Sequence, residues 1–172
     1  MNLTLHHTSL DELDEIKDVL VDSFGAKEGP ALVRLLQQLA QDNALTLALL
    51  ARVEEEAVGF VAFSPVTLET QPLHAQIEGL APLGVRQKWQ KKGIGSALIK
   101  EGLNFLQNKG TQAVVVLGEA AYYKRFGFEN ALSLGITNEY GAKEHFRIHA
   151  LADNGLAGLS GLARYAPAFQ GI

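Results

Sequence analysis

The chain has 172 residues, of which 47% are hydrophobic, and its formal net charge is −4. This length predicts one globular domain over residues 1–172, with a core at 1–151 and a C-terminal tail at 152–172 that packs on it. The absence of cysteine excludes disulfides, thiolate metal sites and a cysteine nucleophile. The net negative charge argues against nucleic acid as a partner.

The composition also argues against a membrane or exported protein. The longest apolar run, residues 44–51 with only Thr46 interrupting, is far shorter than the roughly 20 residues that span a bilayer. The first residues lack the cationic start and apolar stretch of a secretory signal. We therefore expect a cytoplasmic protein with no membrane partner.

The N-terminal part predicts a strand, two helices and a hairpin. Leu3 and Leu5 indicate a short strand, and Ser9-x-x-Glu12 is a capping box that opens the first helix. Leucines at 32, 35, 36 and 39 form the apolar stripe of a second helix. Residues 46–53 and 57–66 then predict an antiparallel pair whose turn holds three glutamates. The side chains expected to face inward from the first helix are those of Leu10, Leu13, Ile16, Leu20 and Phe24.

The remaining elements alternate between strands and helices. Residues 76–85 predict a strand, with a bulge or bend where Pro82 and Gly84 interrupt the pattern. The other predicted elements are an amphipathic helix at 94–107, a buried strand at 113–117, a helix at 120–125, and two strands from 128 onward and at 146–151. The glycine-rich residues 154–161 predict a surface connection.

The segment Arg86-Gln87-Lys88-Trp89-Gln90-Lys91-Lys92-Gly93-Ile94-Gly95-Ser96 carries the densest chemical signal. It places four cations beside two glycines, directly before a helix, and such a helix start offers unpaired N–H groups to an anion. A diphosphate would fit there, although the same residues could also form an ordinary strand-to-helix turn with a solvated basic face. Neither an ATP-type P-loop nor a dinucleotide fingerprint is present.

Two segments resemble the GNAT superfamily of N-acetyltransferases. Leu83-Gly84-Val85 followed by Gln90-Lys91-Lys92-Gly93-Ile94-Gly95-Ser96 resembles its acetyl-CoA signature, and Tyr122-Tyr123-Lys124-Arg125-Phe126-Gly127-Phe128 is similar to a second segment of the superfamily. The order of the predicted elements is similar too, so the resemblance covers nearly the whole chain. One departure is Gln87, where many relatives carry proline.

The resemblance implies an α+β fold of the GNAT acyl-CoA N-acyltransferase type. Its mixed, mostly antiparallel sheet of about seven strands would be splayed open, with helices on both faces. Acetyl-CoA would be the co-substrate, its pantetheine arm paired with backbone groups of the bulged strand and its pyrophosphate held at the helix start. The implied cofactor-binding residues are Leu83, Gly84, Val85, Gln90, Lys91, Lys92, Gly93, Ile94, Gly95 and Ser96.

The implied reaction is direct transfer of the acetyl group to a primary amine of a small molecule or peptide. The resemblance assigns the general acid to Tyr123 through the register of the second segment. Adjacent Tyr122 and Tyr123 cannot both face inward on one helix, so one of the two is expected to be a core or surface residue. Glu78 or Glu119 would serve as the base through water, but both could equally be solvent-facing carboxylates.

No metal site is expected. His145 and His149 could ligate a metal on a helix, but alternation of polar and apolar residues places them on the polar face of a strand. The open alternatives are a regulatory module that binds acyl-CoA without turnover and an acyltransferase with a non-amine acceptor. The sequence does not identify the acceptor, and it leaves a homodimer open.

Overall fold

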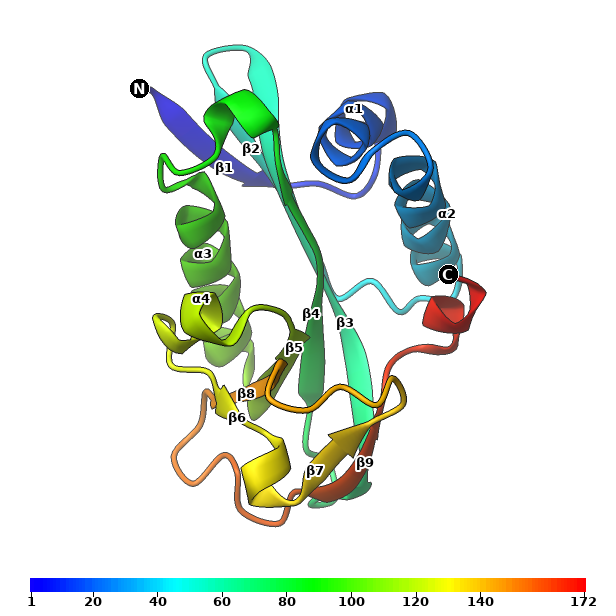
Figure 1. Ribbon diagram of the computed structural model, residues 1–172, viewed down its shortest axis with the longest axis vertical. Helices are drawn as coiled ribbons and strands as arrows, with labels where there is room; N and C mark the ends of the chain where they lie inside the picture. Colours follow the sequence, from blue (N-terminus) through cyan, green and yellow to red (C-terminus); the bar gives the residue numbers. More distant parts are fainter. The chain divides into compact units, whose positions relative to one another are not determined.

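The computed structural model describes residues 1–172 and has an α+β fold (Figure 1). The α-helices are α1 (Leu13–Phe24), α2 (Glu28–Gln41), α3 (Ile94–Lys109) and α4 (Ala120–Lys124). The strands are β1 (Leu3–His7), β2 (Leu47–Val53), β3 (Glu56–Thr70), β4 (Ile77–Val85), β5 (Ala113–Leu117), β6 (Glu129–Asn130), β7 (Ile136–Asn138), β8 (Phe146–Ala150) and β9 (Ser160–Arg164). Short 3₁₀ turns occupy Gln87–Trp89, Leu132–Leu134 and Pro167–Gly171. None of the helices is both long enough and apolar enough to span a bilayer.

The chain divides into two compact units. Unit 1 comprises residues 1–64, 81–102 and 167–172, and unit 2 comprises residues 65–80 and 103–166. Strands β3 and β4 and helix α3 each begin in one unit and end in the other.

Unit 1 contains the predicted N-terminal strand, helix pair and hairpin. Strand β1 pairs with β2, and β2 pairs with β3, both in antiparallel fashion, and the second part of β4 lies next to β3. Helices α1 and α2 pack against each other (Figure 1). The core between the helix pair and the strands is apolar, as the leucine and isoleucine spacing predicts. Its buried members are Ile16, Val19, Leu20, Val33, Leu36, Ala48, Leu50, Ala57, Phe60 and Ala62.

Two details of the first helix differ from the expectation. Phe24 is 37% exposed and does not belong to the core, because it lies at the last residue of α1, where the helix ends. The capping box is also wrong. Helix α1 begins at Leu13 with Glu12 as its N-cap, and no side chain caps it. The Glu12 carboxylate instead binds Arg52 and His6, so a contact distant in sequence outcompetes the local cap.

Helix α3 buries the face that its periodicity predicts. Ile94, Leu98 and Leu106 are almost completely buried. Gly59 of β3 makes close packing possible, because a Cβ atom there would lie 2.9 Å from Ile94 Cγ2 and 3.0 Å from Leu98 Cδ1. The helix ends before Gly110, whose φ of 98° favours glycine.

Unit 2 is built around the buried strand β5. It pairs in parallel with the first three residues of β4, Ile77–Gly79, and in antiparallel fashion with β8, which in turn pairs with β6. Strand β9 pairs with β3 in antiparallel fashion and with β7 in parallel. The sheet is therefore mixed and mostly antiparallel, as the resemblance implies, and the expectation of about seven strands omitted two of the nine. One of them, β9, lies within the expected tail at 152–172.

Candidate active site

The predicted phosphate loop forms a concave backbone turn before α3. Lys91 and Gly93 both have positive φ, 61° and 86°, and the Gly93 carbonyl accepts the first helical N–H, from Ala97, at 3.0 Å. The N–H groups of residues 94–96, which lie between Gly93 and Ala97, therefore have no acceptor within the helix. A Cβ atom on Gly93 would have no neighbour within 4 Å, so space is open beside this turn. This geometry matches an anion-binding nest at a helix N-terminus.

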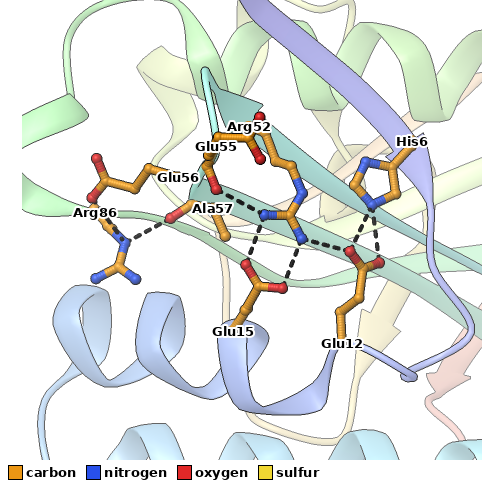
Figure 2. Close-up of polar contacts among 8 residues, drawn as sticks. All are labelled: His6, Glu12, Glu15, Arg52, Glu55, Glu56, Ala57 and Arg86. Carbon is orange, nitrogen blue, oxygen red and sulfur yellow. Dashed lines mark hydrogen bonds and ion pairs between the residues drawn. The ribbon is translucent and has the colours of Figure 1, made fainter.

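The four cations of the loop fall into two pairs with different surroundings. Lys88 Nζ lies 3.1 Å from the Glu56 carboxylate. Arg86 Nε lies 3.7 Å from the same carboxylate and donates to the Ala57 carbonyl at 2.7 Å (Figure 2). Lys91 and Lys92 are exposed and form no ion pair. The nest therefore keeps two uncompensated positive charges beside its free N–H groups, an arrangement that could hold an anionic group such as a diphosphate.

Strand β4 leads directly into this loop. It continues through Pro82 to Val85. A Cβ atom at Gly84 would lie 3.1 Å from Phe24 and 3.3 Å from Leu20 of α1, so any side chain there would require these neighbours to shift by a few tenths of an ångström. Gln90 belongs to the predicted cofactor set, and its Nε2 donates to the Val85 carbonyl at 3.0 Å. This bond leaves one lone pair of the Val85 carbonyl for another donor.

Tyr123 is the buried member of the tyrosine pair. It is 8% exposed, and its ring makes edge contacts with Tyr122 and Phe128 at centroid distances of 5.1 and 5.7 Å. Burial, with a smaller contribution from Tyr122, raises the pKa of the Tyr123 phenol well above its usual value of 10. The phenol is therefore protonated throughout the physiological range. Tyr122 is half-buried, and the Arg125 guanidinium lies 5.4 Å from its ring centroid.

Gly118 allows the Tyr123 ring to lie where it does. It follows β5, and a Cβ atom at Gly118 would be only 2.3 Å from Tyr123 Cε2. We did not single out Gly118 from the sequence. A glycine directly after a buried strand is nonetheless a recognisable sign of close approach by another group.

The two candidate bases have contrasting environments within unit 2. Glu78 is 3% exposed on β4, opposite Val114 of β5. Glu119 is exposed and precedes α4, where its backbone carbonyl accepts the Tyr123 N–H at 3.1 Å. The assignment of a base to either carboxylate stays a prediction.

The two histidines considered as ligands lie as the alternation predicts. His145 is exposed before β8, and His149 follows on the strand, with its Nδ1 at 3.0 Å from the Gly127 carbonyl. The intervening Phe146 and Ile148 are fully buried.

A cluster of charged side chains ties α1 to the strands of unit 1 (Figure 2). The Arg52 guanidinium donates to Glu12 at 2.6 Å and to Glu15 at 2.7 and 2.8 Å, and His6 Nε2 lies 2.9 Å from Glu12. Hydrogen bonds from Arg52 and then His6 lower the pKa of Glu12 to about 2. This Arg52 cluster, made of His6, Glu12, Glu15 and Arg52, anchors the N-terminal end of α1.

Comparisons with known proteins agree with this geometry. The model of the Acetyltransferase (GNAT) family matches residues 13–128. The N-acetyltransferase YhbS of Escherichia coli K12 is 40% identical over 145 residues, which are 83% of this chain and 86% of YhbS. The N-acetyltransferase YjhQ of the same strain is 37% identical over 129 residues, 74% of this chain and 70% of YjhQ.

Solved structures show the same relationship. The crystal structure of Escherichia coli YhbS in complex with CoA has a TM-score of 0.89 and 35% identity, and the match covers 99% of this chain and 93% of YhbS. A GNAT family acetyltransferase from Brucella melitensis in complex with acetyl-CoA has a TM-score of 0.75 and 28% identity, with 98% of each chain covered. On the family match, the identity to YhbS and the shared fold, the chain belongs to the GNAT acetyltransferase family.

Proposed function

We propose that this protein transfers the acetyl group of acetyl-CoA directly to a primary amine of a small molecule or peptide. The observation that carries the proposal is the nest before α3, with positive φ at Lys91 and Gly93 and two lysines that form no ion pair. Membership of the acetyltransferase family supports it, as do the bound CoA of YhbS and the bound acetyl-CoA of the Brucella protein.

The residues before and at the start of α3 fit the two polar parts of CoA. Backbone N–H groups of 94–96 and the side chains of Lys91 and Lys92 would hold the diphosphate. Backbone groups of Leu83 and Val85, at the end of β4, would pair with the pantetheine amides. Gly84, between these two residues, packs closely on α1.

Bound acetyl-CoA supplies the thioester carbonyl that the amine attacks. Tyr123 Oη would donate its proton to the departing sulfur, a role for which its raised pKa keeps it in the protonated form. Glu78 or Glu119 would take the proton that the amine loses, through a water molecule. No covalent bond between the protein and the acetyl group is needed.

A thiol-release screen tests this function. The purified protein is incubated with acetyl-CoA and small amines, amino acids, polyamines or peptide amino termini, and release of free CoA is followed. Amine-dependent release with a mass increase of one acetyl group on the amine is the expected result. CoA binding with no release for any amine would favour a regulatory acyl-CoA-binding module, and release with alcohols alone would favour a non-amine acceptor.

A further inference from the structure

The segment just before the nest is tied to the end of α1 by Asp22. The Asp22 carboxylate accepts the backbone N–H of Gln87 at 2.6 Å, and the Asp22 carbonyl accepts Gln87 Nε2 at 3.0 Å. Asp22 lies in the last turn of α1, where the helix dipole disfavours a negative charge. The contact with Gln87 therefore accounts for an aspartate at position 22, whereas the stability of α1 does not.

A second tie comes from the start of β3. The Glu56 carboxylate accepts the indole N–H of Trp89 at 3.2 Å and pairs with Lys88 at 3.1 Å. Hydrogen bonding to Lys88, and then to Trp89, lowers the pKa of Glu56, so the carboxylate is ionised at neutral pH. Two carboxylates from different elements thus hold this short segment. Asp22 of α1 contacts Gln87, and Glu56 of β3 contacts Trp89.

The nest that follows needs such support. Lys91 adopts a left-handed conformation, which costs free energy for a residue with a side chain. On its C-terminal side the turn is fixed by α3, which begins at Ile94. On its N-terminal side the turn is preceded by the contacts of Gln87 and Trp89 and by the bond from Gln90 to the Val85 carbonyl.

We propose that Asp22 and Glu56 are positioning residues that hold this loop in its anion-binding conformation before CoA arrives. Neither carboxylate would contact the phosphates, because two negatively charged groups repel each other. Their contribution is that binding does not have to order the loop, which improves affinity without any new contact. The inference rests on the proposed function, since it concerns the same CoA site.

The test compares alanine with the amide of equal charge at each position. Asp22→Asn keeps an oxygen that can accept the Gln87 N–H, and Asp22→Ala removes it, while both lose the negative charge. Glu56→Gln and Glu56→Ala form the same comparison for Trp89. We expect the Kd for CoA, measured by calorimetry, to be about three- to tenfold higher in each alanine variant than in its amide partner. The kcat at saturating acetyl-CoA should change by less than about twofold.

Trp89 is the only tryptophan, so its fluorescence reports the loop without any ligand. In Glu56→Ala the emission should shift to the red and its anisotropy should fall, and Glu56→Gln should resemble the wild type. Glu15→Ala is the matched control, because it breaks a carboxylate contact of the same unit that lies in the Arg52 cluster. It should lower thermal stability and leave both the CoA Kd and the Trp89 emission unchanged.

The outcomes separate this inference from the proposed function. If the wild type binds CoA and each alanine variant binds it as well as its amide partner does, the positioning role is overturned and the function stands. If the wild type does not bind CoA, the proposed function and this inference fall together. Should Asp22→Ala fail to fold, Asp22→Leu keeps the size of the side chain and removes the oxygen that accepts the Gln87 backbone N–H. Should Glu56→Ala fail to fold, Trp89→Phe removes the indole donor from the loop side. Unchanged Kd values in these replacement variants would equally overturn the inference.

Discussion

Replacing Gly118 by alanine should displace the Tyr123 side chain and so lower activity, although Tyr123 itself is not substituted. The new Cβ atom would lie 2.3 Å from Tyr123 Cε2 and 2.9 Å from Cδ2. Non-bonded carbon atoms pack at about 3.5 to 4.0 Å, so the ring has to move by about 1 Å. Gly118 does not have a positive φ, and its backbone N–H donates to the His145 carbonyl at 2.9 Å, so the backbone itself accepts alanine.

A shift of this size has a predictable kinetic cost. Misplacing a catalytic group by about 1 Å can reduce the rate by about 10². We therefore expect kcat to fall about 10- to 100-fold in Gly118→Ala, with the KM for acetyl-CoA changed less than about twofold, because the nest is untouched. Overpacking should also cost about 1 to 3 kcal/mol of stability. Thiol-release kinetics and thermal unfolding measure the two effects.

A double-mutant cycle tests whether the loss of kcat in Gly118→Ala depends on the Tyr123 hydroxyl. Tyr123→Phe alone should lower kcat by about 10 to 10³, because general acid catalysis is lost and water substitutes only in part. In that background Gly118→Ala should cost less than about threefold more. Tyr122→Phe is the control on the same helix and should also cost less than about threefold. Full activity of folded Gly118→Ala, or an equal loss in both backgrounds, would refute the role of Tyr123.

Three further predictions follow from the charges. Replacing both Lys91 and Lys92 by alanine should raise the KM for acetyl-CoA about tenfold and weaken its salt dependence, and an unchanged KM would place the phosphates elsewhere. Because the pKa of Tyr123 is raised above 10, the ratio of wild-type kcat to that of Tyr123→Phe should be constant from pH 7 to about pH 10, and a decline within this range would contradict the burial argument. Glu12→Gln should lower the free energy of unfolding by about 1 to 2 kcal/mol at pH 7. Because the folded-state pKa of Glu12 is depressed from 4.5 to about 2, this difference should be present above pH 4.5 and disappear as the pH falls toward 2, which urea denaturation can follow.

The order and type of most elements could be predicted from local pattern. The helical spacing of apolar residues shows which face of a helix is apolar, so the burial of Leu36, Leu39 and Leu98 was predictable. Strand β9 was missed, because its sequence, Ser-Gly-Leu-Ala-Arg, has no apolar run and becomes a strand only by pairing with β3 and β7. The capping box failed for a related reason, since Arg52, 40 residues later in the chain, takes the Glu12 carboxylate.

The sequence by itself predicted the backbone geometry of the proposed anion site. Gly93 directly precedes a helix that starts at Ile94, and such a turn leaves N–H groups without acceptors, a property that depends on neighbouring residues alone. Tertiary structure alone decided which cations remain available: Glu56 takes Lys88 and leaves Lys91 uncompensated. It also decided that Tyr123, and not its neighbour, is buried against a glycine. Such outcomes depend on contacts between residues far apart in the chain, which the local spacing of residues does not predict.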